Sequence, residues 1–151
     1  MNPLASEPAF AVPTLPEAGN IAARLVVAAA LGGLLGYERE RVGKAAGLRT
    51  HMLVALGSAL FVLAGREAGM AVGDVSRIVQ GIATGIGFVG AGAILKSAEA
   101  RQVHGLTTAA SVWLTSAVGV SVATGALWLP ILGVVMALII LSTLRGLEPR
   151  P

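Results

Sequence analysis

The sequence contains no cysteine, which excludes disulfide bonds, thiolate metal sites and cysteine nucleophiles. It has only two histidines, so a zinc site made of three histidines from one chain is excluded as well. Charged residues are also scarce, at 13% of the 151 residues against roughly 25% in an ordinary soluble domain. Because 55% of the residues are apolar and the mean hydropathy is +0.80, we expect a single domain whose side chains are poorly soluble in water along most of the chain.

The 11 basic residues give a net charge of +3, but they are scattered among apolar blocks. Proteins that bind nucleic acids present lysine and arginine as a clustered face that follows the phosphates. The sequence shows no such clustering, so we expect no nucleic-acid partner. The basic residues are better explained as a signal of membrane topology.

Long runs without charge predict membrane spans. A helix needs about 20 mostly apolar residues to cross a bilayer, because the hydrocarbon core is about 30 Å thick and each residue rises about 1.5 Å. We therefore predict an all-α membrane protein, a bundle of five transmembrane helices in contact with the lipid bilayer. The predicted helices are 21–37, 50–65, 78–95, 105–123 and 127–144.

The positions of lysine and arginine predict the orientation. Five spans place the two termini on opposite sides of the membrane. If the C-terminus is cytoplasmic, only Arg24, Arg66 and Arg77 fall outside, and the other eight of the 11 basic residues lie in cytoplasmic segments. Cytoplasmic loops are enriched in basic residues, so we predict an extracytoplasmic N-terminus and a cytoplasmic C-terminus.

Both ends of the chain are predicted to be short tails. Residues 1–20 hold four of the seven prolines, and no lysine or arginine precedes Arg24. A cleavable signal peptide begins with basic residues, so we predict instead a disordered extracytoplasmic tail over 1–20. The membrane domain is predicted over 21–145 and a short cytoplasmic tail over 146–151. With so few residues after the last span, we expect no soluble C-terminal domain.

Glycines mark the faces where helices are expected to pack. The segment GIGFVG spells the G-x-G-x-x-G of dinucleotide-binding proteins, but it lies inside an apolar run and lacks the later acidic residue, so that interpretation is excluded. In lipid, small residues let helix backbones approach closely. The helix 78–95 carries glycines on two faces, so we predict that it is central and touches two neighbours. Whether a glycine face meets the same chain or a second copy in a homo-oligomer stays open. The predicted helix-packing residues are Gly32, Gly36, Gly81, Gly85, Gly87, Gly90 and Gly92.

A polar stripe lies on the helix 105–123, where Thr108, Ser111, Thr115 and Gly119 fall within about an 80° arc. We favour hydrogen bonding between helices as its role, at about 0.6–2 kcal/mol for each bond. The alternative is a lined path for water or an ion. Because the predicted spans contain no aspartate or glutamate, a dedicated cation carrier would be unusual.

The densest group of polar residues is predicted at the cytoplasmic mouth of the bundle. Glu38 directly follows an apolar span, and we expect it to pair with Arg49 at the membrane surface. The alternative is a solvated loop whose charges only set the topology. His51 and His104 are candidates for pH sensing or metal binding, although a lone interfacial histidine usually does neither. We find no nucleophile with a base and no metal-ligand set, and therefore predict no enzyme, no metal and no cofactor.

Four segments together carry a family resemblance: GLLGYERE (33–40), AGLRTHMLVALGSALF (46–61), GIGFVGAGAIL (85–95) and GLTTAASVWLTSAVGV (105–120). With these segments in this order, the chain resembles the MgtC/SapB family of bacterial inner-membrane proteins over residues 20–145. The resemblance implies a multi-pass protein of the bacterial inner (plasma) membrane. It also implies a role in magnesium homeostasis, in adaptation to low Mg²⁺ and, in pathogens, in virulence. Some family members continue into a soluble C-terminal domain, and this chain stops at Pro151.

The resemblance also implies how the chain acts. We predict a membrane regulator of other transport or energy-coupling machinery, working through contact with another membrane protein, for which the proton-driven ATP synthase is a candidate. The alternative is a transporter of Mg²⁺ or another small ion. Matched onto this sequence, the family motifs place the candidate functional residues at the inner mouth: Glu38, Arg49, Thr50, His51, Thr107 and Thr108.

Overall fold

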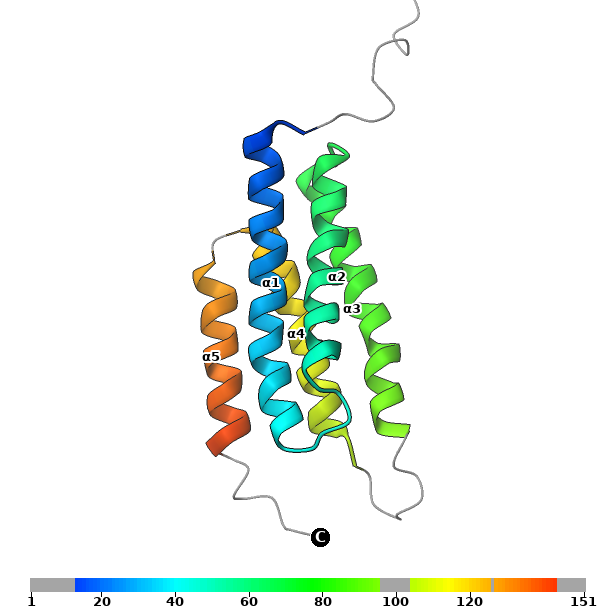
Figure 1. The fold of residues 1–151 in the computed structure, drawn as a ribbon. Coiled ribbons are helices and arrows are strands. Elements are labelled where there is room, and N and C mark those ends of the chain that lie inside the picture. The colour runs from blue at the N-terminus through cyan, green and yellow to red at the C-terminus, as the bar shows by residue number, and fades with distance from the viewer. Residues whose placement is uncertain (1–12, 96–103, 126, 144–151) are drawn as a thin grey trace, which may run out of the picture.

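The computed structural model describes residues 13–95, 104–125 and 127–143. Over these residues the chain forms five α-helices and no strand, which confirms the predicted all-α class (Figure 1). The first four helices are long and apolar enough to cross a membrane, and the fifth is a shorter apolar helix of 16 residues. The helices are α1 (Leu15–Arg41), α2 (Leu48–Glu67), α3 (Val72–Leu95), α4 (Leu106–Thr124) and α5 (Trp128–Thr143).

Helix α1 begins earlier than predicted, which corrects the extent of the N-terminal tail. The carboxylate of Glu17 accepts hydrogen bonds from the backbone N–H of Thr14 at 2.9 Å and from its hydroxyl at 2.7 Å, so the first turn is capped. Pro16 lies in this first turn, where its missing N–H leaves no hydrogen bond unmade. Residues 15–20 are therefore helical, not disordered. The predicted tail segments 1–12 and 146–151 lie outside the described residues.

Helix α4 lies at the centre of the bundle and contacts the four other helices. Helices α3 and α5 flank the bundle on opposite sides, and α1 packs beside α2 (Figure 1). The prediction that the helix 78–95 is central is therefore wrong, whereas the prediction that it touches two neighbours is confirmed, because α3 contacts α2 and α4. In the most apolar stretch of α4, half of the residues are buried, whereas in that of α3 only 6% are buried. Both helices are rich in small residues, and the sequence pattern alone does not distinguish the one that other helices surround.

Two glycines of α1 bring this helix into close contact with α2. A Cβ at Gly32 would lie 2.6 Å from the carbonyl oxygen of His51, and one at Gly36 would lie 2.7 Å from Cα of Leu48. Both distances are shorter than real Cβ contacts, so the backbone of α1 can approach α2 this closely only where a side chain is missing. This approach forms the interior that holds the polar residues described below.

Two arginines bind the last turn of α4, at the end of the bundle where α1 begins. Arg24 Nη1 donates to the carbonyl oxygens of Val122 at 2.6 Å and Gly125 at 3.3 Å, and Arg66 Nη1 donates to the carbonyl of Ala123 at 2.6 Å. The last carbonyls of a helix have no partner within the helix and form the negative end of its dipole. Cationic side chains from α1 and α2 therefore satisfy and fix this end of α4.

Candidate functional site

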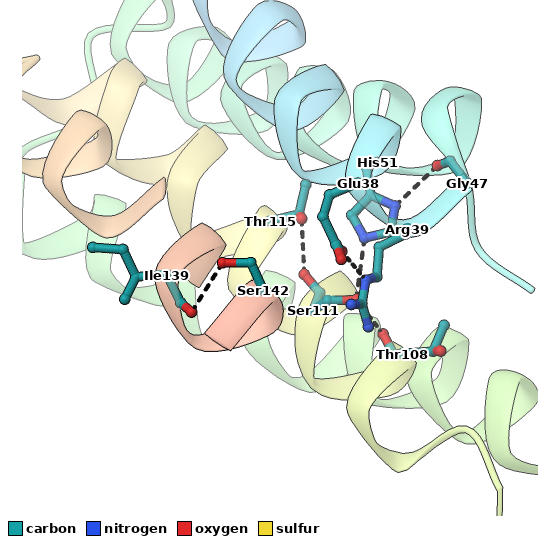
Figure 2. A network of polar contacts seen from close by, with 9 residues as sticks. All are labelled: Glu38, Arg39, Gly47, His51, Thr108, Ser111, Thr115, Ile139 and Ser142. Carbon is teal, nitrogen blue, oxygen red and sulfur yellow. Dashed lines mark hydrogen bonds and ion pairs between the residues drawn. The ribbon is translucent and has the colours of Figure 1, made fainter. Parts of the chain in front are cut away.

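Polar side chains from α1, α2 and α4 meet inside the bundle, at the end where α1 leads into α2 (Figure 2). The side chain of Glu38 is half-buried, and the other members are buried. We call this group the polar cluster, and it consists of Glu38, Arg39, His51, Thr108, Ser111 and Thr115.

Helix α1 contributes an ion pair between neighbouring residues. Arg39 Nε donates to Glu38 Oε2 at 2.5 Å, and the side chains are 4% and 17% exposed, respectively. Arg39 follows Gly32 and Gly36 by seven and three residues, so it shares the face of α1 that packs against α2. Because an unpaired charge is costly to bury, the bond to Glu38 is what allows an arginine at this position.

Helix α2 contributes His51, whose side chain is fully buried. Its Nδ1 lies 2.9 Å from the carbonyl oxygen of Gly47, and its Nε2 lies 3.2 Å from Oγ of Ser111 on α4. The ring fits because α1 has a glycine opposite it: a Cβ at Gly36 would lie 2.9 Å from Cβ of His51. His51 therefore connects the start of α2 directly to α4.

The hydroxyl groups of α4 are hydrogen-bonded within the bundle. Ser111 Oγ donates to the carbonyl oxygen of Thr108 at 2.8 Å, and Thr115 Oγ1 donates to the carbonyl of Ser111 at 2.8 Å. Further into the bundle, Ser116 and Ser58 of α2 share a hydrogen bond of 2.8 Å. The polar stripe predicted from the sequence is therefore buried, and it bonds to another helix at one residue, Ser111, while Ser116, which was not part of the predicted stripe, makes a second bond to α2.

Apolar residues close the interface beyond Ser116. Gly119 of α4 packs directly against the carbonyl oxygen of Ala55. A core of fully buried small residues continues from there towards the arginine-bound end of α4, and includes Ala28, Ala59 and Val122. In this structure, the stripe therefore ends at Gly119, where the backbones of α4 and α2 are in close contact and small apolar side chains fill the interface beyond.

The structure brings together three of the six residues predicted for the inner mouth, namely Glu38, His51 and Thr108. Arg49 and Thr107 are exposed, and Thr50 is half-buried outside the network of bonds described above. The expected pairing of Glu38 with Arg49 is wrong, because Glu38 pairs with Arg39. An adjacent arginine on the buried face of α1 reaches the carboxylate, whereas Arg49 lies on the exposed face of α2.

Sequence reasoning missed Arg39 as a member of the site. The signal that could have found it is its helical spacing from the glycine face of α1, which places its side chain towards α2. His104 is exposed just before α4, so it does not join His51. Among the residues that the structure describes, no group of three histidine, aspartate or glutamate side chains could hold a metal ion.

A second feature is an apolar groove of about 540 Å³ between α2 and α3, which we call the α2–α3 groove. Ser58 is its one hydroxyl-bearing lining residue, and Gly57, Gly81 and Gly85 expose backbone along it. A Cβ at Gly81, Gly85, Gly87 or Gly92 would meet no atom within 4 Å, whereas one at Gly90 would lie 3.5 Å from Cβ of Ala109. Of the predicted packing glycines on α3, only Gly90 thus lies where an added Cβ would touch another helix of the described chain. The groove is lined by Leu53, Val54, Gly57, Ser58, Phe61, Ile78, Gly81, Ile82, Gly85, Ile86 and Val89.

Comparison with known proteins identifies the family. A model described as the MgtC family matches residues 25–150. The chain belongs to the MgtC family. Among curated proteins it is 41% identical to protein SrpB of Synechococcus elongatus over 136 residues, and 44% identical over 135 residues to a protein of Escherichia coli named "Putative magnesium transporter YhiD". It is also 48% identical over 103 residues to protein MgtC of Brucella abortus.

These relatives are longer than the region they share with this MgtC family member. The alignment with SrpB covers 83% of this chain and 75% of SrpB, and that with YhiD covers 84% and 61%. The alignment with MgtC of Brucella abortus covers 67% of this chain and 41% of the relative. No solved structure matches the chain. The shared region therefore identifies a membrane protein of the MgtC family, and the name of one relative, YhiD of Escherichia coli, refers to magnesium.

Proposed function

We propose that this MgtC family member is a non-enzymatic regulator in the bacterial inner membrane. It acts by accommodating a transmembrane helix of another membrane protein in the α2–α3 groove. The observation that carries the proposal is that Gly57, Gly81 and Gly85 line the groove while a Cβ at each would meet nothing within 4 Å. Helices associate in lipid through close packing at small residues, because lipid offers no hydrophobic force between them. The groove therefore offers a partner helix the surface that membrane helices use.

The family resemblance supplies the proposed setting. We place the α1–α2 loop on the cytoplasmic side of the membrane, as the distribution of basic residues predicts. The regulated partner is transport or energy-coupling machinery, with the proton-driven ATP synthase as the candidate, and the physiological role is adaptation to low Mg²⁺ and, in pathogens, virulence. The hydrogen bonds of the buried α4 hydroxyl groups and the close backbone contact at Gly119 support regulation over conduction.

The test compares two leucine substitutions on α3. Gly85→Leu fills the groove, whereas Gly87→Leu adds the same side chain at an exposed position that does not line it. Both positions have free space around an added Cβ, so both variants are expected to fold. Each tagged chain is purified from bacterial membranes in mild detergent, and the recovered ATP synthase is quantified by mass spectrometry. Circular dichroism and gel filtration check the fold.

We expect Gly85→Leu to reduce recovery about tenfold, which corresponds to a loss of about 1.4 kcal/mol of binding free energy, and Gly87→Leu to leave it unchanged. If the parent chain does not recover ATP synthase, that candidate partner is rejected. Equal recovery of a partner by both folded variants would show that the groove is not the contact surface.

A second candidate function is transport of Mg²⁺ or another small ion. It is favoured by the name given to YhiD of Escherichia coli and by the row of hydroxyl groups on α4. The test is Mg²⁺ flux into proteoliposomes, with a magnesium channel as the positive control and empty vesicles as the blank. A transporter would lose flux when Thr108, Ser111 and Thr115 are replaced together by alanine.

The matched control replaces three exposed hydroxyl residues that bond only within their own helices, namely Thr84, Thr124 and Ser142. Flux that persists in the control variant and disappears in the variant lacking the hydroxyl groups of Thr108, Ser111 and Thr115 would establish a transporter and overturn the regulator proposal. No flux from folded parent protein is the outcome that the regulator proposal expects.

A further inference from the structure

The contacts of His51 do not fit a neutral imidazole with every bond made. A carbonyl oxygen only accepts hydrogen bonds, so the 2.9 Å contact with Gly47 requires a proton on Nδ1. A neutral ring then has an unprotonated Nε2, which can only accept. Its neighbour is the hydroxyl group of Ser111, 3.2 Å away, which would have to donate its single proton to the ring.

That proton already has another acceptor. Ser111 Oγ lies 2.8 Å from the carbonyl oxygen of Thr108, and this shorter contact also needs the hydroxyl proton. With a neutral ring, one of the two contacts of Ser111 lacks a proton. With a doubly protonated ring, each contact has one: Nδ1–H donates to Gly47, Nε2–H donates to Ser111, and Ser111 donates to Thr108.

We propose that His51 is a proton-binding site that joins α2 to α4, and that its protonated form makes the complete chain of hydrogen bonds from Gly47 to Thr108. When the proton leaves, the hydroxyl group of Ser111 is shared between two acceptors and the α2–α4 contact weakens. The ring is fully buried between the two helices, so protonation changes a contact inside the bundle and not on its surface.

The charged residues of α1 in the polar cluster form an ion pair with each other. They are Glu38 and Arg39, which carry opposite charges and are directly bonded. Helices α4 and α5 carry no charged residue within their bounds, and the charged residues of α3, Asp74 and Arg77, lie in its first two turns at the far end of the bundle. On α2 itself, Arg49 is exposed. Replacing Ser111 therefore removes a hydrogen bond of the His51 ring without changing any charge near it.

Helix α2 connects the proton site at His51 to the α2–α3 groove. His51 lies in the first turn of α2, and the groove residues Leu53, Val54 and Gly57 lie in the turns that follow on the same rigid helix. A change in how firmly α2 is held to α4 therefore moves one wall of the groove relative to the bundle. This last step rests on the proposed function, whereas the proton site does not.

The experiment uses the full chain in lipid nanodiscs with ¹⁵N-labelled histidine. The sequence has only two histidines, so the His104→Gln variant leaves the ring of His51 as the one labelled side chain. The ¹⁵N shifts of the ring distinguish protonated from unprotonated nitrogens directly. On lowering the pH from about 9 to about 4, we expect Nδ1 to stay protonated while Nε2 changes from unprotonated to protonated.

Ser111→Ala removes the acceptor for Nε2–H, so we expect the midpoint of this titration to move to more acidic pH by about one unit, a tenfold loss of proton affinity. Ser116→Ala is the matched control, since it removes a buried hydroxyl from the same helix that bonds to Ser58 instead. Ser111→Thr keeps a hydroxyl group and should restore the midpoint. A ring that stays neutral across the range, or a midpoint that is the same in Ser111→Ala and Ser116→Ala, would overturn the proposal. Loss of the groove partner in the preceding test would leave this titration unaffected.

Discussion

Gly119 of α4 lies directly against the carbonyl oxygen of Ala55 on α2, and a side chain at position 119 would overlap the α2 backbone. This contact sets how closely the central helix approaches α2. It lies one turn beyond Thr115 on α4 and one turn beyond His51 on α2, at the edge of the apolar core to which Ala55 belongs.

Gly119→Ala is expected to destabilise the bundle, because the added methyl group has no space and neither backbone can yield without moving a helix. Overpacking of this kind costs about 1–3 kcal/mol. The thermal midpoint in detergent, followed by circular dichroism, measures the effect. Gly133→Ala on α5 is the control, since an added Cβ there meets nothing within 4 Å. Equal midpoints for the two variants would show that α2 and α4 are not in tight contact.

Arg66→Ala is expected to lower stability by about 1–3 kcal/mol, because it removes a charged donor from the carbonyl of Ala123 at the end of α4. Arg24→Ala should act in the same direction through the carbonyl of Val122. Arg77→Ala serves as the comparison, since this arginine lies on α3 and donates to none of the described carbonyls at the end of α4. Chemical unfolding in mixed micelles provides the measurement, and an Arg77 variant as unstable as the Arg66 variant would contradict the proposed helix cap.

Arg39→Ala is expected to impair the protein more than Arg49→Ala. Removing Arg39 leaves the half-buried carboxylate of Glu38 without its partner, at a cost of up to about 3–5 kcal/mol, whereas Arg49 is exposed. The readout is complementation of growth in low Mg²⁺, at matched protein level in the membrane. The opposite order would restore the pairing of Glu38 with Arg49 that the sequence suggested.

The hydrogen bond between Ser58 and Ser116 is expected to stabilise the contact of α2 with α4 by about 0.6 kcal/mol, and at most about 2 kcal/mol, because such bonds between membrane helices are individually weak. A double-mutant cycle with alanine at both positions isolates this coupling from the effect of each substitution alone. A coupling energy of zero would assign the two serines to space filling.

Much of the fold could be predicted from the sequence because the relevant signals are local. Long apolar runs predicted the five helices, and four segments in a fixed order indicated the family. The early start of α1 was also encoded locally, in the spacing of Thr14 and Glu17, but the surrounding prolines favoured the prediction of a tail. Part of the site was visible as well, since Glu38, His51 and Thr108 lie in the segments that carry the resemblance.

The composition and order of apolar and small residues thus determined by themselves that this chain is a helical membrane protein of the MgtC family. Only the tertiary structure decided that α4, not α3, is central, that Glu38 pairs with Arg39, and that the glycines of α3 line a groove. The reason is physical: in lipid, small residues permit close approach on any helix face, and the sequence does not state which face a neighbour occupies. That choice depends on how all five helices fit together around the buried hydroxyl groups of α4.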